Sequence, residues 1–137
     1  MRFVLDTNVL LSACWKPEGL EARVVHLALH GQCTACVSPQ IWAEYGDVLN
    51  REKFASLHAR TKVLLASLKP LVCCVEPQIR ADAASDASDN CFLECAAAAG
   101  ATVLITGNLK HFPAQWGATR VMNARQFLTE FPAYLAA

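Results

Sequence analysis

A chain of 137 residues is the size of one domain and is long enough to bury a hydrophobic core without disulfides or structural metals. Hydrophobic residues make up 54% of it and charged residues 18%, a composition that excludes an intrinsically disordered protein. Its 12 basic and 12 acidic residues cancel, so nucleic-acid binding would require a local basic patch rather than an overall positive charge.

Strand-like and helix-like segments alternate along the chain. Strands are expected at residues 2–5, 33–37, 71–75, 102–106 and 121–122. Helices are expected at residues 20–30, 39–50, 60–68, 89–99 and 123–130, with loops at 6–19 and 76–88. This order predicts one α/β domain over residues 1–137, in which helices cover both faces of a parallel sheet.

The chain shows no targeting or membrane signal. It opens directly with an expected strand, and no apolar run reaches membrane-spanning length. We therefore expect a cytoplasmic protein without membrane contact, whose seven cysteines are reduced thiols. Cys33 and Cys36 fall in one strand and point to opposite faces, so a shared zinc ion is not expected. Cys91 and Cys95 are expected as small buried side chains on one helix.

Polar side chains follow two of the expected strands. Residues 3–5 contain no polar member, which predicts a central strand buried on both faces, and Asp6 follows at its carboxyl end. Ligands bind at this edge of open α/β sheets, and a buried carboxylate is costly unless it is paired or binds a metal. The strand at 102–106 likewise runs into Gly107 and Asn108, although an ordinary turn would also explain this pair.

Two helices contribute further acids. In the helix at 39–50, Glu44 lies at the edge of the apolar face, beside Ile41 and Val48. Asp89 lies one turn before Phe92, near the centre of the inward stripe of its helix, although helix capping would equally favour an acid there. Glu94 is expected to point away from the core. Asp82 and Asp86 are expected as loop acids in water.

The four polar residues form one predicted site. Asp6, Glu44, Asp89 and Asn108 should all lie at the carboxyl edge of the sheet, where three carboxylates would repel one another without a cation. Oxygen ligands suit Mg²⁺ or Mn²⁺ rather than zinc, and such ions commonly serve phosphoryl chemistry. The set therefore predicts a metal-dependent active site.

Taken in order, four stretches of the chain resemble those of PIN-domain nucleases. They are Asp6-Thr7-Asn8-Val9-Leu10, Ser38-Pro39 followed by Glu44, Asp86 to Ala101, and Thr106-Gly107-Asn108 with His111-Phe112. No single stretch is specific, but the ordered set is, and the likeness covers roughly residues 1–128. The chain most resembles the bacterial and archaeal members that are toxins of toxin–antitoxin pairs.

The resemblance implies a Rossmann-like sheet of order 3-2-1-4-5 and Mg²⁺- or Mn²⁺-dependent cleavage of single-stranded RNA. It assigns the metal to Asp6, Glu44 and Asp89, and it places Asn108 in the catalytic set where many members carry a fourth acid. It also gives Thr7, Asn8 and Thr106 the task of orienting Asp6. A cognate antitoxin and a homodimer are the partners that it implies, and the second apolar face of the helix at 20–30, with Val25 and Leu29, also points to a partner.

Basic residues concentrate at positions 51–69. A solvated helix face is the default interpretation, and the alternative makes Arg51, Lys53, Arg60 and Lys62 candidate RNA contacts. Phe54 is the only aromatic residue in this segment, so base stacking is not expected.

Three other functions compete with this interpretation. An aspartyl-phosphate phosphatase would carry an acid where Asn8 stands, and a dinucleotide-binding enzyme would need glycines after the first strand. A catalytically degenerate PIN fold that binds RNA or protein without cutting is the remaining alternative, against which the three acids argue.

Overall fold

The computed structural model describes residues 1–136; Ala137, where the expected domain ends, lies outside them. Its strands are β1 (Arg2–Leu5), β2 (Thr34–Val37), β3 (Cys73–Cys74), β4 (Val103–Ile105), β5 (Gln115–Trp116) and β6 (Thr119–Met122). Its α-helices are α1 (Thr7–Trp15), α2 (Leu20–Leu29), α3 (Pro39–Leu49), α4 (His58–Leu68), α5 (Asn90–Ala99), α6 (Ala124–Glu130) and α7 (Pro132–Leu135). Three short 3₁₀ helices are η1 (Glu52–Leu57), η2 (Ala87–Asp89) and η3 (Leu109–His111).

The strands form one sheet in the order β3-β2-β1-β4-β6-β5. All neighbouring pairs are parallel except β5 and β6. The α/β prediction and the order of the parallel strands are confirmed, since β6 is the expected fifth strand. The antiparallel strand β5 was not expected, because two residues are too few to show alternation. Gly117, with φ +58°, allows the tight turn between β5 and β6.

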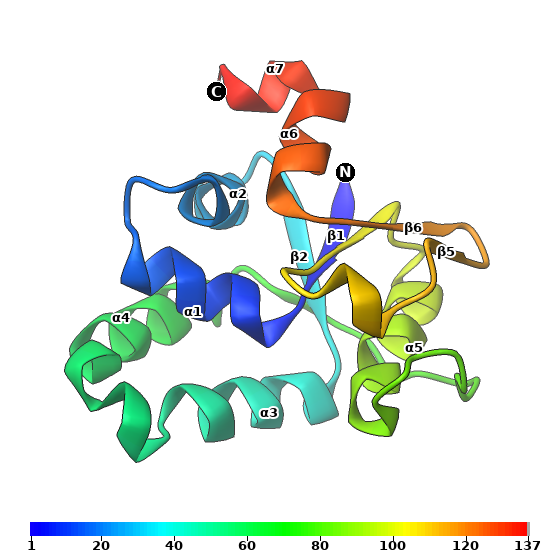
Figure 1. The fold of residues 1–137 in the computed structure, drawn as a ribbon, viewed down its shortest axis with the longest axis horizontal. Coiled ribbons are helices and arrows are strands. Elements are labelled where there is room, and N and C mark those ends of the chain that lie inside the picture. Colours follow the sequence, from blue (N-terminus) through cyan, green and yellow to red (C-terminus); the bar gives the residue numbers. More distant parts are fainter. Residues whose placement is uncertain (137) are drawn as a thin grey trace.

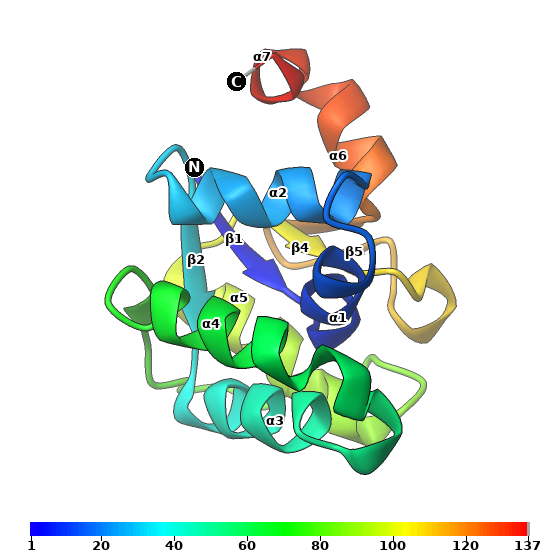
Figure 2. The ribbon, with the colours of Figure 1, turned by 90° about the vertical axis from the view of Figure 1, so that its left-hand side faces the viewer.

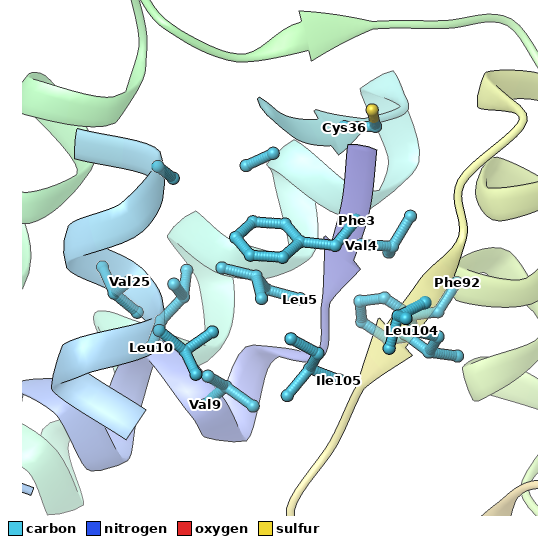
Figure 3. Packing of buried hydrophobic residues seen from close by; sticks show 14 of the residues in the cluster. Phe3, Val4, Leu5, Val9, Leu10, Val25, Cys36, Phe92, Leu104 and Ile105 are labelled. Carbon is cyan, nitrogen blue, oxygen red and sulfur yellow. The ribbon is translucent and has the colours of Figure 1, made fainter. Parts of the chain in front are cut away.

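Helices cover both faces of the sheet (Figures 1 and 2). Figure 3 shows Phe3 and Leu5 of β1 directed toward α1 and α2, where Leu10 and Val25 meet them. Val4 points to the opposite face, toward Phe92 of α5. These side chains are almost completely buried, which fixes β1 at the centre of the fold and Asp6 at its carboxyl end.

Helix α1 begins directly after Asp6, where a loop was expected. The buried residues of α1 fall one turn apart, at Val9, Leu10, Ala13 and Cys14, as in an amphipathic helix. Its first turn, Thr7-Asn8-Val9, has poor helix propensity, which concealed this pattern in the sequence. The helix is important for the site because it turns Thr7 and Asn8 back toward the edge of the sheet.

The expected start and stop signals act as predicted in three later helices. Ser38 caps α3 by accepting a hydrogen bond from the backbone of Ile41 at 3.2 Å, with Pro39 in the first turn. Gly100 ends α5 with φ +62°. Asn123 opens α6 with a capping box. Ser38 and Asn123 lie at the carboxyl edge of the sheet, where β2 and β6 end, whereas Gly100 lies at the opposite edge, where the chain enters β4.

The second apolar face of α2 is covered only in part within the chain. Val25 is only 1% exposed, and α2 packs against α1 and α4. Leu29 is half-buried and lines an open apolar surface with Val63 and Leu64 of α4, so a partner at this face stays a prediction. All seven cysteines are free thiols, and Cys91 and Cys95 are buried as expected. Cys33 and Cys36 are buried as well. No helix within residues 1–136 combines the length and the apolar character that crossing a membrane requires.

The prediction that Glu94 points away from the core is wrong. Its side chain is 8% exposed, accepts a hydrogen bond from the backbone of Ala81 at 2.9 Å, and lies 3.7 Å from the guanidinium of Arg80. One turn earlier on α5, the Asn90 side chain accepts from the backbones of Ala83 and Ala84. Helix geometry alone could not reveal that the loop at 76–86 folds over this face. Glu94 and Asn90 therefore anchor that loop to α5.

Substitution of Glu94 by alanine is expected to destabilise the fold by about 1–3 kcal/mol, because the buried N–H group of Ala81 loses its acceptor. The measurement is the urea midpoint of unfolding. Glu130→Ala is the matched control, since Glu130 pairs with Arg120 at 2.9 Å in a half-exposed position and should cost less than about 1 kcal/mol. Equal midpoint shifts for the two variants would show that Glu94 does not anchor the loop.

Candidate active site

Asp6 is held at the end of β1 by groups from two other segments. Its backbone N–H donates to the carbonyl of Ile105 at 2.9 Å, which continues the pairing of β1 with β4. Its carboxylate oxygen Oδ2 accepts from the hydroxyl of Thr106 at 2.7 Å and from the amide of Asn8 at 3.2 Å. The other end of the Asn8 amide accepts from the backbone of Gly107 at 3.0 Å. Asn8 and Thr106 thus fix the orientation of Asp6.

Gly107 is required by this arrangement. A Cβ atom at this position would lie 3.3 Å from Oδ1 of Asn8, within the space that the amide uses to accept the backbone hydrogen bond. The absence of a side chain lets the loop after β4 approach α1 closely. Thr106 and Gly107 therefore act together with Asn8 in holding Asp6.

Two hydrogen bonds, one made by the neighbouring Tyr45 and one by Glu44 itself, hold Glu44 at the same edge of the sheet. The buried hydroxyl of Tyr45 donates to the carbonyl of Leu5, the residue before Asp6, and so fixes α3 beneath β1. The hydroxyl of Thr7 donates to Oε2 of Glu44. The resemblance assigned Thr7 to Asp6, whereas its side chain contacts Glu44 and its backbone supports Asp6.

Asp89 is partly buried at the end of η2, directly before α5. Its Oδ2 lies 3.3 Å from Nδ1 of His111, which belongs to η3. In the sequence His111 belongs only to the motif that ends at Phe112, and nothing there indicates that it contacts Asp89. Asp86 is exposed, as expected, but its charge raises the pKa of both Asp89 and Glu44. It therefore faces the same edge of the sheet.

The environment raises the pKa of all three site acids. Burial is the main cause for Asp6, and the charges of Asp89 and Glu44 add to it, so that its pKa lies at about 6 although Thr106 opposes the shift. Burial also raises the pKa of Glu44, as does the charge of Asp89, whereas Thr7 and Arg51 lower it. For Asp89, burial and the charge of Asp86 outweigh His111. The charges of the three acids thus act on one another at the carboxyl edge of the sheet, and we call this acidic edge the cleft.

This donor set fits a hard divalent cation that retains some of its water. Within residues 1–136, no three His, Cys, Asp or Glu side chains lie close enough together to form a ready-made metal cage. Mg²⁺ does not require such a cage, since it keeps several waters and commonly takes only one or two carboxylates from a protein. The donors offered here are oxygen atoms, and a cation would relieve the repulsion that raises their pKa values.

Asn108 lies at the same edge but makes no side-chain hydrogen bond within the described residues. Its backbone N–H donates to the Thr106 hydroxyl at 3.0 Å, and its side chain is exposed at the start of η3. Thr106 therefore connects Asp6 directly to the backbone of Asn108.

The four candidate RNA contacts are in different surroundings. Arg51 pairs with Asp47 at 3.6 Å and acts on Glu44, and Lys53 lies 5.2 Å from the centre of the Phe54 ring. Arg60 donates to the carbonyl of Cys14 at 2.9 Å, which fastens α4 to the end of α1. Lys62 is exposed on α4. Of the four, Arg51 acts directly on a site acid.

Comparison with known proteins identifies the family. The family described as the PIN domain matches residues 2–110, a stretch that contains Asp6, Glu44, Asp89 and Asn108. This chain belongs to the PIN-domain family. No curated protein shows a significant match to it.

A solved structure shares the architecture of this PIN domain. The structure of VapBC2 from Rickettsia felis, bound to a DNA fragment from their promoter, superposes with a TM-score of 0.56 at 18% identity. The match covers 90% of this chain and 98% of the other. At this identity the likeness concerns the fold alone.

Proposed function

We propose that this PIN domain is an endoribonuclease that cleaves single-stranded RNA with Mg²⁺ or Mn²⁺. The observation that carries the proposal is the convergence of Asp6, Glu44 and Asp89 from three separate elements on one cleft at the carboxyl edge of the sheet. Nuclease activity is general in the family. The resemblance of the motifs assigns the metal to these same three acids.

Asp6 and Asp89 would hold the cation, partly through water, and Glu44 would bind it or orient the attacking water. When bound, the cation lowers the pKa of a water molecule and offsets negative charge on the phosphate. Thr106 and Asn8 keep the carboxylate of Asp6 in place, and Thr7 does the same for Glu44. His111 fixes Asp89 through its Nδ1 atom. No side-chain nucleophile is needed.

The test is cleavage of end-labelled RNA by the purified chain at increasing Mg²⁺ or Mn²⁺, with EDTA as the metal-free control. Cleavage should require the cation and should favour single-stranded RNA over a duplex of the same sequence. A chain that binds RNA equally well with and without the cation, and never cuts it, would instead be a degenerate PIN fold that serves as a binding module.

Asn108 offers a separate test of the site. Replacement by aspartate adds a carboxylate at the edge of the cleft, and we expect Asn108→Asp to lower the Mg²⁺ concentration required for half-maximal cleavage. Glu76→Gln, in an exposed position outside the cleft, is a control that should leave this concentration unchanged. Coincident Mg²⁺ curves for Asn108→Asp and the parent would remove Asn108 from the metal site.

The biological role that we propose is that of the cytoplasmic toxin of a toxin–antitoxin pair. The resemblance of the motifs to such toxins and the fold shared with VapBC2 support it. Expression of the chain alone should arrest growth, Asp6→Asn should abolish the arrest, and a small protein encoded beside it should relieve the arrest by binding. A homodimer remains part of this proposal, and sedimentation of the free chain tests it.

A further inference from the structure

A groove with aromatic and basic walls lies beyond the acid cleft. Its walls come from the carboxyl end of α1, with Leu11, Trp15 and Lys16, and from η1, with Lys53 and Phe54; Glu21 is its acid. The indole of Trp15 is 64% exposed, and the ammonium of Lys53 lies 5.2 Å from the centre of the Phe54 ring. The sequence offered only Phe54 near this basic segment, but the fold adds Trp15.

The groove is in line with the candidate active site. Asn8, which binds Asp6, and Trp15 are seven residues apart on α1, so they lie on the same helical face about 10 Å apart along the axis. On the facing side, Thr7 joins α1 to Glu44 of α3, and α3 leads to Arg51 and η1. Figure 1 shows α1, which follows β1, and α3, which follows β2, running toward the same side of the molecule.

The charges along this path change sign. The cleft holds Asp6, Glu44 and Asp89, which would repel a phosphodiester strand outside the metal position. Arg51 follows, with a charge that lowers the pKa of Glu44, and Lys53 and Lys16 line the groove against Glu21. An RNA strand that enters the cleft therefore meets basic side chains on the side of the groove.

We infer that this groove holds an unpaired base of the RNA, stacked on Trp15, while Lys53 and Lys16 contact the adjoining phosphates. The inference rests on the proposed RNA cleavage and supplies a reason for its preference for single strands. A base in a duplex is already stacked and paired, whereas a single strand presents its base to an aromatic face. The combination of an exposed indole with lysines selects a nucleic-acid strand over an apolar peptide.

The experiment measures binding of labelled single-stranded RNA by anisotropy, with Mg²⁺ present and in an Asp6→Asn background that prevents cutting. Trp15→Leu should weaken binding at least about fivefold, the lower end of the effect of losing one stacked base. Trp15→Phe should recover most of the affinity, because it restores an aromatic face. Trp116→Leu, on strand β5, is the matched control and should leave affinity unchanged.

A second oligonucleotide distinguishes the contribution of the bases to binding from that of the phosphates. An oligonucleotide of the same length with abasic sites should bind equally to the Asp6→Asn protein and to its Trp15→Leu derivative. Lys53→Ala should weaken the binding of both oligonucleotides and reduce the salt dependence of binding by about one phosphate contact. Arg125→Ala, an exposed charge on α6, should change neither. Circular dichroism and melting temperatures show whether each variant remains folded.

Three results would overturn the inference. Equal RNA affinity with and without Trp15, in a parent chain that still cuts RNA, would remove the groove from the RNA path and leave the proposed function intact. A parent chain that neither binds nor cuts RNA would defeat the proposed function and the inference with it. If Trp15→Leu still binds RNA but no longer binds an adjacently encoded protein, the groove is the binding site of that protein.

Discussion

Asp6→Asn is expected to reduce RNA cleavage at least about a hundredfold, because it removes the negative charge of a carboxylate that two other segments of the chain hold in place. Loss of an outer partner of a metal ligand already costs about 10–100-fold, and Asp6 is proposed to bind the cation itself. The asparagine retains an oxygen that can accept from Thr106, so the fold should persist. Initial rates of RNA cleavage at saturating Mg²⁺ give the measurement.

Asp82→Asn is the matched control for this substitution, since Asp82 is an exposed acid of the loop at 76–86. It should cleave RNA at the rate of the parent. Cleavage by Asp6→Asn within a factor of a few of the parent, from a preparation free of contaminating nuclease, would contradict a role for Asp6 in the reaction.

The stability of the metal-free protein is expected to fall as the pH rises from about 4 to above 6. The pKa of Asp6 is 3.8 in its ordinary state and about 6 in the fold, so between these values the folded protein keeps a proton that the unfolded chain has lost. This favours the folded state at low pH, and about 3 kcal/mol is lost as Asp6 ionises. Glu44 and Asp89 shift in the same direction.

Urea unfolding at a series of pH values, with EDTA present, measures this loss, and comparison with Asp6→Asn isolates the contribution of Asp6. The variant should lack that part of the slope and be more stable than the parent above pH 6. Millimolar Mn²⁺ should raise the melting temperature of the parent at pH 8 by binding the ionised acids, and should raise that of Asp6→Asn less. Identical pH profiles for the two proteins would contradict the raised pKa of Asp6.

The sequence predicts those parts of this fold that local patterns determine. The apolar runs before Asp6 and Thr106 identify β1 and β4, and Ser38, Gly100 and Asn123 mark helix ends through their own chemistry. Because parallel strands end at one edge, these patterns also bring the candidate site residues together.

The remaining features depend on tertiary contacts between distant residues. Glu94 is covered by a loop that returns over α5, and His111 reaches Asp89 from beyond β4. Trp15 lines the same groove as Phe54 because α1, which was expected as a loop, brings it near η1. None of these contacts produces a periodic pattern in the sequence. Helix periodicity alone therefore placed Glu94 on the side away from the core, which is wrong.

The most direct measurement is the position of Mn²⁺ in a crystal of this PIN domain, located by its anomalous scattering. We predict an Mn²⁺ ion in the cleft, within ligand distance of a carboxylate oxygen of Asp6 and held also by Asp89 or Glu44, and we predict its loss in crystals of Asp6→Asn. An empty cleft at an Mn²⁺ concentration that supports RNA cleavage would contradict a metal-dependent active site at these acids.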